Sequence, residues 1–184
     1  MLPVIFDVSD VTIALVGGGA QACRRLRMLD ASGADNVRVF APDATPEMRE
    51  LAGARLRAHL PDAADITAAT LVFAGDLDDT AAQKIAALAR AAGKPVNVED
   101  ITALCDFHVP SIIRRGDLLL TASTGGKSPA LARRIRAHLE ARFPESWGAR
   151  LDELAAARAD WRRRECGDIP ARTDRFIDEK GWLA

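Results

Sequence analysis

Compact apolar runs alternate with amphipathic stretches over the first hundred residues of the chain. Apolar runs of this length are typical of strands buried in a parallel sheet. The predicted strands are Val11–Val16, Val37–Ala41, Leu56–Leu60, Leu71–Ala74 and Pro95–Val98. Between them, apolar residues recur at helical spacing, as in Ala22, Leu26 and Leu29. This alternation predicts an α/β fold with a Rossmann-like, doubly wound parallel sheet.

Helix start signals support these boundaries. Thr45 followed by Pro46 predicts an N-cap and a first helical residue, and Asp78 or Asp79 can cap the next helix. The apolar stripe from Ala82 to Ala89 belongs to that second helix, which Gly93 ends.

The pattern changes after residue 100. Residues 107–113 and 117–123 read as two strands joined by a hairpin turn at Arg114-Arg115-Gly116. A strong helix over 130–143 follows, with Ser128 as N-cap and Pro129 at its first position. A second helix, with Trp147 and Trp161 on one stripe, runs towards residue 164.

Residues 165–184 are polar with weak periodicity, which predicts a loop and a frayed helix. The expected organisation is therefore a nucleotide-binding domain over 1–104, a small α+β dimerisation and active-site region over 105–145, and a helical C-terminal tail over 146–184.

Candidate chemistry begins at the first strand, which ends in a glycine cluster. Gly17, Gly19 and Ala22 fit the G-x-G-x-x-G/A spacing of a dinucleotide-binding turn. Such a turn brings backbone N–H groups at a helix N-terminus against the pyrophosphate. A plain turn is the alternative interpretation. The complete β-α-β unit that follows favours the nucleotide site.

The second strand ends in Phe40 and Ala41, where many dehydrogenases carry an acidic residue for the ribose. The nearest carboxylate is Asp43, so backbone groups of the Ala41-Pro42-Asp43 turn are expected to contact the ribose. Beyond Arg38, no basic side chain is placed to hold a 2′-phosphate, which favours NAD over NADP.

Composition narrows the class of protein. No apolar run approaches the ~20 residues of a membrane span. Residues 1–10 contain Asp7 and Asp10 and no basic residue, so we expect no targeting signal and a cytoplasmic protein. Cys23, Cys105 and Cys166 form no C-x-x-C pair and are expected to be small buried side chains or free thiols.

Charge is unevenly distributed along the chain. Residues 1–113 hold 10 Lys and Arg against 15 Asp and Glu, whereas residues 114–184 hold 15 against 11. A basic second half can attract acidic small molecules. Nucleic acid is disfavoured because aromatic residues are only 5% of the chain and no nucleic-acid motif is present.

The segment Gly126-Lys127-Ser128 resembles the end of a P-loop, but the glycine that a P-loop requires is replaced by Thr121. Pro129 would also remove an amide from the phosphate cradle. The turn is therefore interpreted as mainly structural, although with Lys127 it can hold a carboxylate.

Several segments, in order and spacing, resemble one family. They are Val16-Gly17-Gly18-Gly19, Asn97-Val98-Glu99-Asp100, Cys105-Asp106-Phe107, Pro110-Ser111-Ile112-Ile113 and Ser123-Thr124-Gly125-Gly126-Lys127-Ser128-Pro129-Ala130-Leu131-Ala132. The family is the precorrin-2 dehydrogenase/sirohydrochlorin ferrochelatase family of sirohaem biosynthesis, and the resemblance covers roughly residues 1–145.

The resemblance implies an NAD-dependent oxidoreductase that converts precorrin-2 to sirohydrochlorin, with Fe²⁺ insertion as a second, lyase activity in bifunctional members. It also implies a homodimer. The family's catalytic aspartate falls on Asp100. Its nucleotide contacts fall on Gly18, Gly19, Ala20, Gln21, Pro42 and Asp43.

Asp100 follows a predicted strand, at the sheet edge where open α/β folds bind ligands. One carboxylate there suffices as general base for a dehydrogenation, and it can accept one pyrrole proton during metal insertion. A helix or turn cap is the alternative role. His59, His108 and His138 lack metal-ligand spacing, so no resident metal is expected and His108 is interpreted as a packed strand residue.

The tetrapyrrole substrate carries several carboxylates, for which the basic half of the chain supplies partners. The expected substrate-binding residues are Arg114, Arg115, Thr124, Lys127 and Ser128, with Arg133 and Arg134 as further candidates. Two alternatives stay open: a dehydrogenase without chelatase activity, and a non-catalytic NAD-sensing module.

Overall fold

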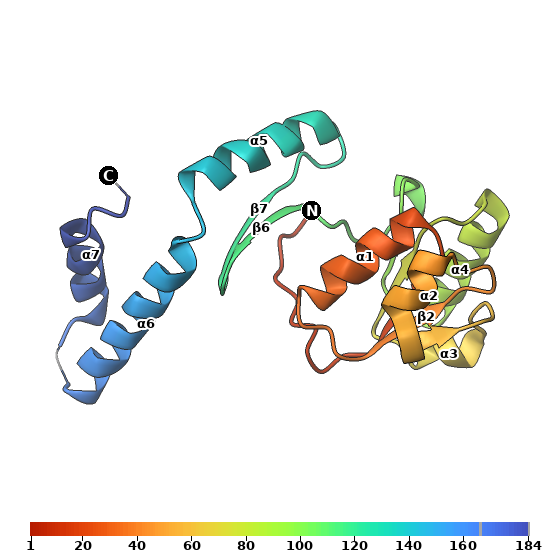
Figure 1. Cartoon of the computed structure of the whole chain (residues 1–184), viewed down its shortest axis with the longest axis horizontal. Coiled ribbons are helices and arrows are strands. Elements are labelled where there is room, and N and C mark those ends of the chain that lie inside the picture. Colours follow the sequence, from red (N-terminus) through yellow and green to blue (C-terminus); the bar gives the residue numbers. More distant parts are fainter. Residues whose placement is uncertain (166, 184) are drawn as a thin grey trace. The chain divides into compact units, whose positions relative to one another are not determined.

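The computed structural model describes residues 1–165 and 167–183. The chain divides into two compact units, Met1–Val109 and Pro110–Ala184, whose elements are labelled in Figure 1. The three-part division at residues 104 and 145 stays a prediction. The expectation for Cys166 lies outside the described residues.

In the first unit, strands and helices alternate as the hydrophobic pattern predicts. The strands are β1 (Ile13–Val16), β2 (Val37–Phe40), β3 (Leu56–Arg57), β4 (Leu71–Ala74) and β5 (Val96–Val98). The helices are α1 (Ala20–Asp30), α2 (Pro46–Ala52), α3 (Ala63–Thr67) and α4 (Asp79–Ala91), with 3₁₀ turns η1 (Gly53–Arg55) and η2 (Thr102–Leu104). The predicted strand over 56–60 was too long, because β3 ends at Arg57.

All five strands are parallel, in the order β3-β2-β1-β4-β5. Ile13 of β1 pairs with Val37 on one side and with Leu71 on the other. The strand order therefore reverses between β1 and β4, and ligands of open α/β sheets bind at the carboxyl ends of strands at such a point. The predicted Rossmann-like sheet is confirmed.

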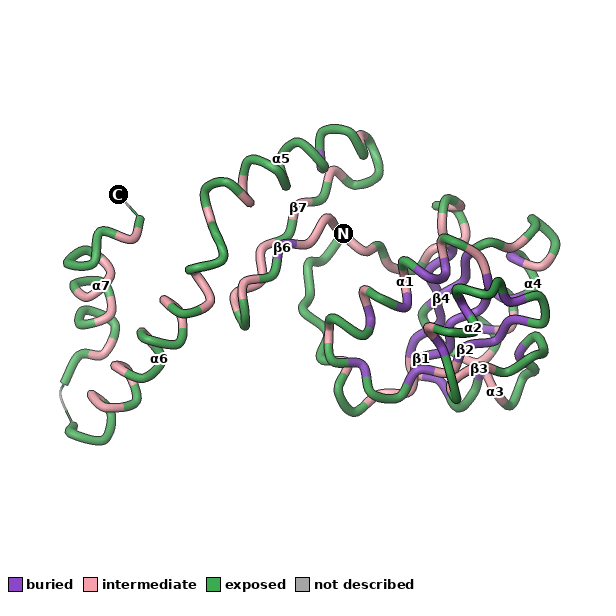
Figure 2. The backbone as a smooth tube through the Cα atoms, viewed as in Figure 1, coloured by how far each residue is buried: buried purple, intermediate pink, exposed green. Residues whose placement is uncertain are grey.

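The sheet is buried on both faces. On one face, Leu26 of α1 and Met48 of α2 pack with Val39 and Phe73 in one hydrophobic cluster. On the other, Ile66 of α3 and Ile85 of α4 pack in a second cluster around Val16, Val72 and Val96. Figure 2 shows buried backbone concentrated in these strands and the helices against them. The dense packing fixes the turns at the strand ends.

The second unit begins with a hairpin of β6 (Ser111–Arg115) and β7 (Leu118–Ala122), followed by α5 (Pro129–Arg142), α6 (Trp147–Arg163) and α7 (Ile169–Glu179). The hairpin was predicted, but its turn lies at Gly116-Asp117 rather than at 114–116, since Arg114 and Arg115 pair with Leu119 and Leu118. Residues 107–110 are not part of the strand.

Helix α7 replaces the loop and frayed helix that weak periodicity predicted. Asp168 caps it by accepting a hydrogen bond from the N–H of Ala171 at 3.1 Å. Phe176 contacts Trp161 and Trp182 edge-on, with ring centroids 5.8 and 5.6 Å apart. Together with these aromatic contacts, a hydrogen bond from Arg158 to the Thr173 hydroxyl at 2.8 Å and an ion pair of Lys180 with Glu153 at 2.6 Å hold α7 against α6.

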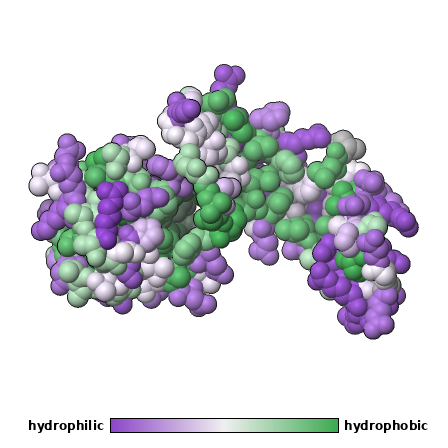
Figure 3. All heavy atoms as spheres, turned by 180° about the vertical axis from the view of Figure 1, so that it is seen from behind, coloured by the Kyte–Doolittle hydropathy of each residue, from purple (hydrophilic) through white to green (hydrophobic). Residues whose placement is uncertain are grey.

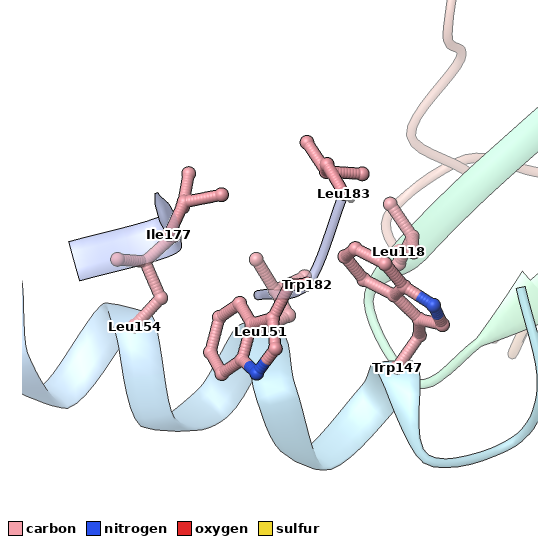
Figure 4. A pocket seen from close by; sticks show the side chains of 7 residues that line it. All are labelled: Leu118, Trp147, Leu151, Leu154, Ile177, Trp182 and Leu183. Carbon is pink, nitrogen blue, oxygen red and sulfur yellow. The ribbon is translucent and has the colours of Figure 1, made fainter. Parts of the chain in front are cut away.

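The aromatic packing of the second unit leaves a small apolar cavity (Figure 4). Its lining residues are Leu118, Trp147, Leu151, Leu154, Ile177, Trp182 and Leu183. Among the described residues of this unit, Ile113 and Ala132 are the only buried hydrophobic side chains. No helix within residues 1–165 and 167–183 is both long and apolar enough to cross a membrane.

Candidate functional site

The turn after β1 is built from three glycines, of which Gly17 and Gly18 pack closely on neighbouring backbone. Gly17 has a φ of +129°, and a Cβ there would lie 1.9 Å from the carbonyl oxygen of Gly75. A Cβ on Gly18 would lie 2.7 Å from the Cα of Ala44. Both positions therefore need glycine to form the turn.

The glycine turn and the turn after β2 lie side by side. The backbone N–H and the Oγ1 hydroxyl of Thr45 donate hydrogen bonds to the carbonyl oxygen of Gly18, at 3.0 and 2.8 Å. Thr45 also caps α2 by accepting from the N–H of Met48, as predicted. Pro42 and Asp43 are exposed between these anchors. The structure thus brings together both segments expected to contact the nucleotide.

The carboxylate of Asp76, a residue that the sequence did not single out, lies at the start of α1. Its carboxylate accepts hydrogen bonds from the N–H groups of Gln21, at 3.1 Å, and Ala22, at 2.8 Å. The available signal was its position two residues after β4, the strand beside β1 in the sheet. Without the strand order, that position is not distinguished from other carboxylates.

Gln21 joins the glycine turn to the expected catalytic base. Its side-chain Oε1 accepts a hydrogen bond from the N–H of Asp76 at 3.0 Å, and its Nε2 donates to Oδ2 of Asp100 at 2.6 Å. Asp100 is exposed just beyond β5 and has a φ of +62°. An exposed carboxylate held at the sheet edge can accept a proton from a bound molecule.

A second pair of side chains flanks Asp100. The guanidinium of Arg25 forms an ion pair with Glu99, contacts Oδ1 of Asn97 at 3.4 Å, and lies 5.1 Å from the ring centroid of Phe73. A shallow pocket beside them is lined by Gln21, Arg24, Arg25, Met28 and Glu99. Glu99 and Asp100 thus have different partners, Arg25 and Gln21.

The turn fits a dinucleotide phosphate. The first N–H groups of α1 have no intrahelical acceptor, and no side chain caps the helix from its N-cap residue Gly19. A carboxylate from elsewhere in the chain already binds two of them, so an anion is accommodated there. Ala20 is exposed at the same end.

The described cysteines and histidines lie apart from one another in other roles. Burial raises the pKa of the Cys23 thiol above its ordinary value, and Cys105 donates to the carbonyl oxygen of Val98 at 3.1 Å. His108 is exposed and outside any strand, so its prediction as a packed strand residue was wrong. Within 1–165 and 167–183, no three His, Cys, Asp or Glu side chains gather in a metal-binding arrangement.

The expected substrate-binding residues all belong to the second unit. The Thr124 hydroxyl bonds the backbone of Ser128, and Ser128 caps α5 by accepting from the N–H of Leu131 at 3.2 Å, as predicted. Arg114 and Lys127 are exposed.

Arg115 has structural partners instead. It donates to the carbonyl oxygen of Phe143 at 2.8 Å and pairs with Glu145 at 2.9 Å, and its side chain is only 12% exposed.

Two family models match this chain, one over most of the first unit and one within the second. A family model described as "Putative NAD(P)-binding" matches residues 4–111. The chain belongs to this NAD(P)-binding family. A second family model, described as "Sirohaem biosynthesis protein central", matches residues 115–142. The NAD(P)-binding match covers β1 to β5 and includes Gly17, Gln21, Asp76 and Asp100.

Curated relatives of this NAD(P)-binding chain are siroheme synthases. That of Ectopseudomonas mendocina (strain ymp) is 39% identical over 150 residues, which cover 80% of this chain and 32% of the relative. That of Methylococcus capsulatus is 39% identical over 172 residues, which cover 92% of this chain and 35% of the relative. The chain therefore spans about a third of the length of these relatives.

A solved structure described as "SirC, precorrin-2 dehydrogenase" has a TM-score of 0.79 and 23% sequence identity with this chain. The match covers 100% of this chain and 93% of that one. The whole fold, parallel sheet and helical C-terminal region together, is shared with that protein.

Proposed function

We propose that this chain binds NAD at the glycine turn and oxidises precorrin-2 to sirohydrochlorin, with Asp100 as the general base. The observation that carries the proposal is the hydrogen bond of 2.6 Å between Gln21 and Asp100. Gln21 belongs to the turn expected to bind the nucleotide, so the base is held next to that turn.

NAD, when bound, supplies the acceptor for the hydride. The first N–H groups of α1 hold its pyrophosphate, and the turn at Pro42 and Asp43 contacts its ribose. Asp100 takes the proton that leaves the substrate as the hydride departs. Gln21 keeps the Asp100 carboxylate oriented through its side-chain amide. The oxidation thus removes one hydride and one proton from precorrin-2.

The basic side chains of the second unit are proposed to hold the carboxylates of the tetrapyrrole. Arg114 and Lys127 are exposed, so their charged groups can reach a carboxylate of the substrate. Arg133 and Arg134 on α5 are exposed as well. Thr124 and Ser128 shape the turn that carries Lys127. Arg115 contributes indirectly, because its guanidinium is bound to Phe143 and Glu145.

Fe²⁺ insertion into sirohydrochlorin is the second candidate activity, with the metal ion as a substrate. It is supported by the match of residues 115–142 to the sirohaem family model and by the names of the relatives. The exposed Asp100 can accept one of the two pyrrole protons that the metal displaces.

A homodimer is proposed from the uncovered apolar surface of the second unit. Leu131 and Ile135 of α5 are 51% and 38% exposed, and Leu118–Leu120 of β7 are only half-buried. Hydrophobic residues reach the surface of this unit in Figure 3. Association of two copies would remove such surface from water. A cytoplasmic location is proposed because Cys23 and Cys105 are free thiols.

The test is anaerobic incubation of the purified chain with precorrin-2 and NAD, followed by visible absorption. We expect sirohydrochlorin to form only when NAD is present. Adding Fe²⁺ afterwards tests the chelatase activity, which must exceed the rate without protein. A folded sample that binds NAD but leaves precorrin-2 unchanged would favour the NAD-sensing alternative.

Asp100→Ala should lower turnover by roughly 10²–10⁴-fold, the usual contribution of a general base, while NAD affinity stays unchanged. Asp79→Asn is the matched control, since Asp79 is an exposed carboxylate in the first turn of α4. Normal turnover in Asp100→Ala would remove Asp100 from the mechanism.

A further inference from the structure

The N-terminus of α1 carries an anion from its own chain. Asp76 binds the N–H groups of Gln21 and Ala22 at 3.1 and 2.8 Å, the second and third residues of the helix. In a nucleotide-binding turn, N–H groups at this end of the helix face the pyrophosphate. The carboxylate therefore satisfies the same donors that a dinucleotide phosphate would use.

The position of the carboxylate against Gly19 leads to the same conclusion. A Cβ built on Gly19 would lie 2.6 Å from Cγ and 2.8 Å from Oδ1 of Asp76. In the G-x-G-x-x-G/A turn, the missing side chain of the second glycine is what lets phosphate approach the backbone. In this chain, the space left by the missing side chain of Gly19 lies against the Asp76 carboxylate.

Nothing neutralises this carboxylate other than the helix end. Within 1–165 and 167–183, no Lys or Arg forms an ion pair with Asp76. Asp76 is exposed to solvent. A pyrophosphate bound to the N–H groups of Gln21 and Ala22 would lie next to the Asp76 carboxylate, and the two negative charges would repel each other. Both anions cannot occupy these donors together.

We propose that Asp76 sets the affinity of the dinucleotide site by competing with the pyrophosphate for the first amides of α1. This inference rests on the proposed function, because it takes the glycine turn as the site of NAD. Binding displaces the carboxylate into solvent, and the N–H groups of Gln21 and Ala22 pass to the phosphate.

The displacement leaves the expected base in place. Asp76 holds the Gln21 side chain through its backbone N–H, at 3.0 Å, and not through its carboxylate. Rotation of the carboxylate away from α1 therefore need not disturb the bond from Gln21 to Asp100. Asp76 acts on the binding of the cofactor equally in the ground and transition states, which changes KM and not kcat.

The experiment measures the Kd of NAD and of inorganic pyrophosphate by calorimetry, for the full chain and for Asp76→Asn. The asparagine keeps the shape and one acceptor but removes the charge. We expect both ligands to bind about tenfold tighter, since hydrogen bonds of a charged group are worth about that factor or more. Asp76→Ser is a second variant, and Asp79→Asn is the control that leaves both Kd values unchanged.

Equal or weaker binding of both ligands by folded Asp76→Asn would overturn the inference, because Asp76 would then support the site rather than compete. Failure of NAD to bind any form, with pyrophosphate still bound tighter by Asp76→Asn, would refute the proposed cofactor and leave the competition standing. In turnover assays, KM for NAD should fall in Asp76→Asn with kcat retained. A fall in kcat instead would contradict the inference.

Discussion

The two units of this chain bury their apolar side chains to very different extents. In the first, both faces of a parallel sheet are covered, and residues such as Leu15, Leu26 and Ile85 are almost wholly inaccessible. In the second, long helices leave Leu131 and Ile135 in solvent. The sheet of the first unit has a complete core of its own, although Met1, Leu2, Val4, Ile5 and Phe6 ahead of it are 49–89% exposed. The described part of the second unit buries only Ile113 and Ala132 among its hydrophobic residues.

The residues proposed to bind the cofactor and those proposed to bind the substrate differ in the same way. The glycine turn, Gln21 and Asp100 are fixed by strands with buried neighbours, so their hydrogen bonds form within a rigid frame. The exposed cations proposed to hold the substrate project from a less densely packed unit. A rigid turn suits a constant cofactor, and an open basic surface suits a large, multiply charged substrate.

The largest expected effect tests whether the second unit is an association surface. Leu131→Glu combined with Ile135→Glu should convert the proposed dimer to a monomer, because charges would replace apolar side chains in the contact. Sedimentation velocity measures the change, with Arg134→Glu on the same helix as the charge control. A wild-type chain that sediments as a monomer would refute the dimer itself.

The next effect concerns the packed core. Leu26→Ala should lower the free energy of unfolding of the first unit by about 2–5 kcal/mol, because it leaves a cavity between α1 and the sheet. Leu131→Ala, at an exposed position, should change stability far less.

Circular dichroism follows this unfolding. The fluorescence of Trp147, Trp161 and Trp182, the tryptophans of the chain, reports the second unit alone. We expect the fluorescence transition to keep its midpoint in Leu26→Ala. A shared shift would mean that the two units unfold together.

A smaller effect appears at alkaline pH in the first unit. Burial raises the pKa of Cys23 above 9.0 in the folded chain. Its contribution to stability is therefore complete below pH 9.0 and is lost as pH rises through the folded pKa, because the unfolded thiol ionises first. In Cys23→Ala, the free energy of unfolding should decrease less steeply as the pH rises. Denaturant titrations at pH values from about 8 to 11 measure this change. An unchanged slope would exclude Cys23 as the cause.

The smallest effect lies at acid pH in the second unit. A hydrogen bond from Arg163, followed by the charge of Arg164, lowers the pKa of Asp160 below 3.8. Its stabilising contribution is present above 3.8 and disappears as pH falls through the lowered value. Because the carboxylate is solvated, Asp160→Asn should change acid unfolding only slightly. A large change would show that this part of α6 is covered in solution.

Much of the first unit was readable from sequence because its signals are local. A buried strand such as Leu71–Ala74 is a compact apolar run, and Thr45-Pro46 and Asp78 mark the starts of helices. The turn of the β6–β7 hairpin was misplaced by one or two residues, since a pair of arginines gives no backbone signal that fixes the register. Helix α7 was missed although Asp168 and Pro170 give a local start signal for a helix; its contacts with α6 are visible only in the tertiary structure.

The candidate site divides in the same way. The spacing of Gly17, Gly19 and Ala22 predicted a nucleotide turn, and the resemblance of the sequence to its family pointed to Gln21 and Asp100. The role of Asp76 at the start of α1 depends on contacts between residues 54 and 55 positions apart in the sequence. The bond from Gln21 to Asp100 spans 79 positions.

The sequence by itself determined the alternation of strands and helices, the parallel sheet and the glycine turn, because each depends on residue types a few positions apart. The tertiary structure decided which strand ends meet. Only the placement of β4 beside β1 brings Asp76 to the amides of α1, and only β5 at the edge brings Asp100 to Gln21. Hydrogen bonds and charges act over a few ångströms, so the site exists only once the strand order has placed these groups together.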